Sequence, residues 1–145
     1  MQETQSCIQV RDEKDIVIAR KVGREISKKL GFGEVDQVRL TTTVSELARN
    51  ILLYASGGEI CIQPVEEIDR NGLKILARDH GPGIKNIRKV LQDGYTTSGG
   101  LGAGLPGVKR LMDEFDIHSE VGVGTEIEVI KWTEKLLSLQ SSSEG

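Results

Sequence analysis

Two polar side chains stand four residues apart in a segment that has helical character. Glu46 and Asn50 have the i, i+4 spacing that places side chains on one face of an α-helix. A carboxylate can accept a proton from a hydroxyl group, and a carboxamide oxygen can bind a hard metal ion. A solvated polar helix face contains such pairs as well, so the pair needs support from the rest of the sequence.

An aspartate ends an alternating apolar run and is followed by glycines. Leu73, Ile75 and Ala77 lie on one side of a predicted strand, and Asp79 has the same parity. A carboxylate at the buried end of a strand needs a polar partner, which the amino group of a flat heterocycle would provide. The DHGPG run over 79–83 is equally typical of a simple turn.

A glycine-rich stretch, Ser98–Gly107, enters a predicted helix with Pro106 in its first turn. Free amides at a helix N-terminus attract phosphate, and small residues allow close approach of the backbone. The stretch contains a GxGxxG run from Gly102 to Gly107, which is a weak dinucleotide fingerprint. No βαβ unit surrounds it, so we favour a phosphate loop over a fragment that binds NAD(P).

A threonine opens the last predicted strand, directly after the turn at 122–124. Thr125 shares parity with Ile127 and Val129, so its hydroxyl should face inward and support the group that Asp79 binds. For any single threonine, a β-branched strand residue without a functional role is the commoner explanation.

The elements that position these residues follow from hydrophobic periodicity and turn signals. Asp12 is predicted to cap the first helix, and Gly31 to end it. Hairpins rather than βαβ alternation predict an α+β fold, a two-layer α/β sandwich whose mixed, mainly antiparallel sheet carries helices on one face. In chain order, the prediction is a strand at 6–10, helices at 13–30 and 34–54, strands at 59–66 and 73–79 joined by a turn at 69–72, helices at 87–92 and 105–115, and strands at 116–121 and 125–132.

The bulk properties limit the class of protein. The length of 145 residues suits one domain, which we place at 1–134, with a polar, disordered tail at 135–145. A net charge of −3 argues against nucleic acid as a partner. No apolar stretch suits a membrane span or a signal peptide, so we expect no membrane partner and a cytoplasmic location. Cys7 and Cys61 are interpreted as small buried hydrophobes rather than as a zinc site.

Taken in this order, the motifs resemble the Bergerat ATP-binding fold of the GHKL superfamily, which includes gyrase, Hsp90 and histidine kinases. The resemblance covers residues 6–132 and is closest to the anti-sigma-factor serine kinases, in particular the stressosome switch kinases. It is carried by the runs SELARNI at 45–51, DHGPGI at 79–84, TSGGLGAGLPGVKRLMDEF at 97–115 and GTEI at 124–127.

The resemblance implies ATP and Mg²⁺ as cofactors. It assigns Asp79 to the adenine amino group, with help from Thr125 through water. It assigns Asn50 to Mg²⁺, and Glu46 to the proton of the attacking hydroxyl. Residues that would shape the nucleotide pocket or cradle the phosphates are Gly81, Gly83, Gly100, Gly102, Ala103, Gly104 and Leu105.

It also implies a function: an ATP-dependent protein-serine/threonine kinase in a partner-switching stress response that regulates a sigma factor. Such a kinase would phosphorylate a STAS-domain antagonist protein, belong to the stressosome complex and, once released, activate a PP2C-type phosphatase. The alternatives are an anti-sigma factor and a non-catalytic, nucleotide-dependent module that binds partners. A sensor histidine kinase is disfavoured, because no lysine follows Asn50 closely and neither His80 nor His118 has a helical phosphoacceptor context.

Two further cations lie near the motifs, Arg49 beside Asn50 and Lys109 in the helix after the glycine-rich stretch. Either side chain would be able to reach a phosphate. We interpret both as solvated charges on helix surfaces, which is the commoner role of such residues.

Overall fold

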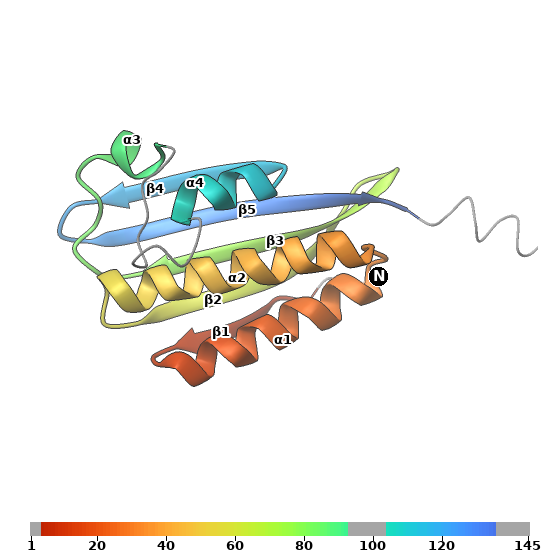
Figure 1. Ribbon diagram of the computed structural model, residues 1–145, viewed down its shortest axis with the longest axis horizontal. Helices are drawn as coiled ribbons and strands as arrows, with labels where there is room; N and C mark the ends of the chain where they lie inside the picture. The colour runs from red at the N-terminus through yellow and green to blue at the C-terminus, as the bar shows by residue number, and fades with distance from the viewer. Residues whose placement is uncertain (1–3, 93–103, 136–145) are drawn as a thin grey trace, which may run out of the picture.

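The computed structural model describes residues 4–92 and 104–135. Five strands form one sheet in the order β1-β2-β3-β5-β4, and every neighbouring pair is antiparallel. Helices α1, α2 and α4 lie along one face of this sheet (Figure 1), which confirms the predicted two-layer α+β sandwich. The elements are β1 Ser6–Val10, α1 Glu13–Lys29, α2 Glu34–Tyr54, β2 Gly58–Glu66, β3 Arg70–Asp79, α3 Ile87–Val90, α4 Gly104–Leu111, β4 Glu114–Glu120 and β5 Gly124–Glu134.

Helix α1 begins and ends where the sequence predicts. The Asp12 side chain accepts a hydrogen bond from the Lys14 amide at 2.9 Å, and Asp15 accepts one from the Asp12 amide at 3.2 Å. This reciprocal capping box satisfies amides that the first turn leaves without helical partners. After the helix, Gly31 adopts a φ of +93°, which is a left-handed conformation that residues with a Cβ atom rarely adopt.

Helix α2 has the predicted bounds, and its predicted apolar face is buried. Leu40, Val44, Leu47, Ala48 and Ile51 are each no more than 2% exposed. The buried surface is wider than this stripe, however, because Thr43 and Glu46 are buried too. The reason is tertiary: α2 lies between α1 and α4 as well as over the sheet (Figure 1), so more than one side of the helix is covered.

The prediction of one long helix at 105–115 is wrong. Helix α4 ends at Leu111, and β4 begins at Glu114, so Phe115 lies in a strand. The Asp113 amide already donates to the Ile130 carbonyl at 3.0 Å, and Glu114 is paired with Ile130 in the ladder. Pairing with β5 and an alternating burial pattern along β4 therefore override the local helical pattern.

The β2–β3 turn lies earlier than predicted, at 67–69, and β3 begins at Arg70 rather than at Leu73. Ladder pairing explains the longer strand, because Asn71 pairs with Glu66 on one side and Arg70 pairs with Glu134 on the other. The Arg70 Nε donates to Glu67 Oε1 at 2.7 Å, and the guanidinium stacks 3.8 Å from the centre of the Trp132 ring. The short helix α3 also ends two residues before its predicted end at Gln92.

The interpretation of the two cysteines as isolated hydrophobes is wrong. Cys7 on β1 and Cys61 on β2 are direct partners in the ladder and form a disulfide across 54 residues of sequence. Cys61 is buried, but Cys7 is exposed. The pairing depends on the register between the two strands, which the sequence spacing alone does not define.

Within residues 4–92 and 104–135, no helix has both the length and the apolar character that a membrane crossing requires.

Candidate functional site

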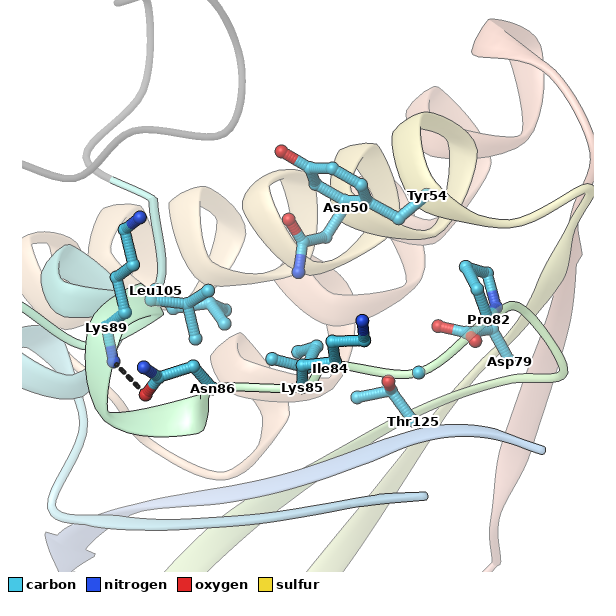
Figure 2. A pocket seen from close by; sticks show the side chains of 12 residues that line it. Asn50, Tyr54, Asp79, Pro82, Ile84, Lys85, Asn86, Lys89, Leu105 and Thr125 are labelled. Carbon is cyan, nitrogen blue, oxygen red and sulfur yellow. Dashed lines mark hydrogen bonds between the residues drawn. The ribbon is translucent and has the colours of Figure 1, made fainter. Parts of the chain in front are cut away.

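A pocket opens at one end of the sheet, between α2, the segment that follows β3, and the starts of α4 and β5. Its cavity measures about 290 Å³. Figure 2 shows side chains from these distant parts of the sequence pointing into the same space. Five residues predicted for the site line it, namely Asn50, Asp79, Gly83, Leu105 and Thr125.

Asp79 and Thr125 are direct neighbours across the β3–β5 ladder. Both lie on the helix-facing side of the sheet and are half-buried, as their parity predicts. Asp79 Oδ1 accepts a hydrogen bond from the Gly81 amide at 2.8 Å, which fixes the carboxylate at the strand end. An ionised carboxylate has about four acceptor sites, so the group keeps capacity for an amino donor.

Ser119 on β4 belongs to the same network, and sequence reasoning missed it. Its Oγ accepts a hydrogen bond from the Ile84 amide at 2.7 Å and lies 2.8 Å from Thr125 Oγ1. The hydroxyl thus ties the segment after β3 to both β4 and β5. The signal was present in the sequence, because Ser119 continues the inward parity of Ile117.

Gly81 and Gly83 are places where two backbones approach closely. A Cβ atom at Gly81 would lie 2.7 Å from the Tyr54 carbonyl oxygen, and one at Gly83 would overlap the backbone of Glu120. Gly83 also has a φ of +81°, which favours glycine. Gly83 lines the cavity, whereas Gly81 packs against the end of α2.

Glu46 and Asn50 on α2 do not lie on a solvated helix face. Glu46 is 8% exposed and lies one turn before Asn50, which lines the cavity. Glu46 Oε1 and Asn50 Oδ1 are both buried, and neither has a hydrogen-bond partner among the described residues. A buried polar atom without a partner is rare in folded proteins and is a signature of a missing ion, water or ligand. The carboxamide of Asn50 offers a hard oxygen donor of the kind that Mg²⁺ prefers, so Asn50 is a residue that would hold this ion.

Two lysines bring positive charge to the pocket, and sequence reasoning missed both. Lys85 and Lys89 line the cavity from the segment after β3 and from α3 (Figure 2). Asn86 caps α3 by accepting a hydrogen bond from the Lys89 amide at 3.1 Å, which fixes the position of the second lysine. Lys85 precedes α3 and Lys89 lies within it, so no periodicity in the sequence signalled the pair.

Lys109 and Arg49, the two cations near the sequence motifs, do not line the cavity. Lys109 is exposed and does not line the cavity, in agreement with a solvated charge. Arg49 is not simply solvated, because its Nη1 lies 3.7 Å from Glu46 Oε2.

The remaining predicted site residues belong to the glycine-rich stretch. Gly104, the first residue of α4, is buried and has a φ of +68°. Leu105 is 2% exposed and lines the cavity. Gly100, Gly102 and Ala103 lie outside the described residues, as does the predicted tail beyond Lys135.

Comparison with known proteins agrees with this geometry. Residues 35–135 match the family model described as histidine kinase-, DNA gyrase B-, and HSP90-like ATPase. The chain is 62% identical over 128 residues to serine/threonine-protein kinase RsbT of Bacillus subtilis (strain 168), covering 88% of this chain and 96% of that protein. It is 32% identical over 107 residues to the anti-sigma F factor of Anoxybacillus flavithermus (strain DSM 21510 / WK1), covering 69% and 72%.

Solved structures share the fold at low identity. The structure of the RsbU and RsbW domains of Rv1364c from Mycobacterium tuberculosis superposes with a TM-score of 0.58 at 14% identity, over 90% of this chain and 32% of that one. The catalytic domain of the histidine kinase ThkA gives 0.50 at 16% identity, over 93% and 99%. The chain therefore belongs to the histidine kinase-, DNA gyrase B- and HSP90-like ATPase family, and it is an ATP-dependent protein-serine/threonine kinase.

Proposed function

We propose that the chain transfers the γ-phosphoryl group of Mg-ATP to a serine or threonine hydroxyl of a STAS-domain antagonist protein. The observation that carries this proposal is that Asn50 lines the pocket and has a buried, unpartnered Oδ1, with the buried Glu46 carboxylate one turn away. A module that only binds nucleotide needs a metal ligand such as Asn50. It does not need a buried carboxylate beside that ligand.

The pocket has two chemically different ends. Asp79 and Thr125 form an end that suits the adenine amino group, with Ser119 holding the threonine hydroxyl. Lys89 lies toward the other end and Asn50 lies between the two ends (Figure 2), where a cation and a carboxamide suit a metal-bound phosphate chain. In this arrangement the γ-phosphate would lie near α2.

Phosphoryl transfer depends mainly on positioning and on stabilisation of charge. Asn50 would hold Mg²⁺, which when bound neutralises charge on the phosphate oxygens. Glu46 would accept the proton of the attacking hydroxyl. The glycine-rich stretch up to Gly104 would contribute amides to the phosphates, which remains a prediction.

The biological setting is also a proposal. The relatives named above include a serine/threonine-protein kinase and an anti-sigma factor, which supports a partner-switching stress response that controls a sigma factor. In that setting the kinase belongs to the stressosome complex, works in the cytoplasm and, after its release, activates a PP2C-type phosphatase. Phosphorylation of the antagonist would weaken its complex with the kinase by placing a dianion at the interface.

The test mixes the chain with Mg-ATP and a candidate STAS-domain protein and follows phosphate transfer by intact mass. We expect the parent to add one phosphate, and Glu46→Gln to lower the rate by about 10²- to 10⁴-fold, as loss of a general base does. Asn50→Ala should abolish transfer and lower the affinity for Mg-ADP. Arg39→Gln, at an exposed ion pair on the same helix, is the matched control and should behave like the parent.

Each alternative outcome has a definite meaning. If Asn50→Ala alone lost transfer, Glu46 would not be the base. If the parent bound the STAS-domain protein but transferred no phosphate, the non-catalytic partner-binding module would be the better explanation. Tight binding to a sigma factor instead would indicate an anti-sigma factor.

A further inference from the structure

Glu46 is held at one carboxylate oxygen only. Oε2 lies 3.7 Å from Arg49 Nη1, whereas Oε1 is buried and has no hydrogen-bond partner among the described residues. The Glu46 side chain is 8% exposed and the Arg49 side chain 33% exposed, so a buried acid is paired with a cation that solvent reaches.

This ion pair differs from the other i, i+3 pairs in the described part of the chain. In Arg39–Asp36 and Arg70–Glu67 the carboxylate side chains are 29% and 50% exposed. Solvent-exposed ion pairs of that kind contribute little to the free energy of folding. A buried carboxylate is different, because removal from water destabilises the charge unless a cation or hydrogen bonds offset the loss. Among the described residues, Arg49 is the cation that is paired with Glu46.

We propose that Arg49 is a positioning residue for phosphoryl transfer. It holds Glu46 through Oε2 and leaves Oε1 as the oxygen that accepts the proton. This inference rests on the proposed function. In the step itself, the acceptor hydroxyl oxygen forms a bond to the γ-phosphorus, its proton passes to Glu46 Oε1, and the bond from the γ-phosphorus to the bridging oxygen breaks to leave ADP.

A direct contact between Arg49 and phosphate is the competing role. It would stabilise bound ATP and ADP, so its loss would weaken nucleotide affinity. A residue that acts through Glu46 instead changes kcat and leaves nucleotide affinity alone, because an interaction used only in the transition state lowers kcat and kcat/KM together.

The experiment compares Arg49→Gln, Arg49→Lys and the control Arg39→Gln in the phosphate-transfer assay, with ADP affinity measured by calorimetry. Arg49→Gln should lower kcat by about tenfold, a fraction of what a general base contributes, with the KM for ATP and the affinity for ADP unchanged. Arg49→Lys keeps the charge and should recover part of the loss. Arg39→Gln should match the parent in every readout.

A double-mutant cycle gives the sharper test. If Arg49 acts through Glu46, then Arg49→Gln should have no further effect on kcat in a Glu46→Gln background. Additive losses in the cycle, or a loss of ADP affinity in Arg49→Gln alone, would overturn the proposal and indicate a contact with phosphate. If Arg49→Gln does not fold, as judged by near-UV circular dichroism, the same cycle with Arg49→Lys decides.

Failure of this inference is distinguishable from failure of the proposed function. A parent that transfers no phosphate rejects the kinase reaction with this acceptor. An active parent, an inactive Glu46→Gln and a fully active Arg49→Gln reject the positioning role alone.

Discussion

At the scale of single residues, the polar groups of the pocket are oriented by the protein before any ligand enters. The Gly81 amide holds Asp79, and Ser119 holds Thr125, at the end of the sheet where β3 and β5 are paired. Groups that are already in place lose little conformational freedom when a ligand binds. Substitutions at this end of the pocket should therefore change nucleotide affinity directly.

Asp79→Asn should lower the affinity for ADP by about tenfold or more, because the Gly81 amide would keep the one side-chain oxygen and the NH₂ donor would face the adenine amino group. Thr125→Ala should have a smaller effect, since its contact with adenine is expected to run through water. Titration calorimetry measures both. Asp116→Asn, at an exposed pair with His118, is the control. Equal affinity in Asp79→Asn and the parent would remove Asp79 from adenine recognition.

Lys89→Gln should lower the affinity for ADP by about tenfold, as loss of a charge-assisted contact does, and leave the affinity for adenosine unchanged. The difference between the two ligands isolates the phosphates. Lys109→Gln removes an equal charge at an exposed position outside the cavity and is the matched control. A similar loss for adenosine would mean that Lys89 shapes the pocket rather than binding phosphate.

The site residues differ in how far the sequence could predict them. The inward orientation of Asp79 and Thr125 could be predicted, because side chains alternate between the two faces of a strand and this alternation can be read from neighbouring residues. Lys89 depends on the path of the chain after Gly83, which no periodicity encodes. The burial of Glu46 depends on the packing of α1 and α4 around α2. The sequence of α2 alone does not contain this packing, so it was equally compatible with a solvent-exposed Glu46.

At the scale of secondary-structure elements, α2 links the core to the chemistry. Leu47 and Ile51 pack into the core from the same helix that carries Glu46 and Asn50. The bounds of α1 were predictable because its capping residue and its apolar periodicity agree. The boundary near Phe115 was not, since a strand pairing distant in sequence decides it.

Gly58 on β2 shows how tightly the sheet is built behind the site. It is the ladder partner of Asp79, and a Cβ atom there would overlap the Arg78 carbonyl oxygen and lie 3.1 Å from Asp79 Cβ. Gly58→Ala should therefore destabilise the fold by about 1–3 kcal/mol and lower ADP affinity. Thermal unfolding and calorimetry measure the two effects.

Gly33→Ala is the comparison for Gly58→Ala, because a Cβ atom at Gly33 meets nothing within 4 Å. It should leave ADP affinity unchanged. If Gly58→Ala bound ADP as the parent does, the backbone at Asp79 would be more adaptable than its packing suggests.

At the scale of the whole molecule, the helices cover one face of the sheet, and a disulfide fastens the edge strand β1 to β2. The bond closes a long segment of chain, and such links stabilise mainly by restricting the unfolded state. The pocket is formed around β3 and β5 instead, so the link should influence stability and binding separately.

Reduction of the disulfide should lower the free energy of unfolding by about 2–4 kcal/mol and leave ADP affinity unchanged. Chemical denaturation with and without reductant measures this. A variant that carries both Cys7→Ser and Cys61→Ser is the control and should not respond to reductant. Two reactive thiols in the untreated parent, with no response to reductant, would show that the cysteines are not bonded in solution.

The position of this bond also bears on how two copies of the chain can associate. A terminal strand at the edge of a sheet is the kind of segment that identical chains exchange to form swapped dimers. The bond between Cys7 and Cys61 closes a covalent ring that contains both α1 and α2. Oxidised monomers therefore cannot trade their first strand while the bond remains, and reduction would open that route to a domain-swapped dimer.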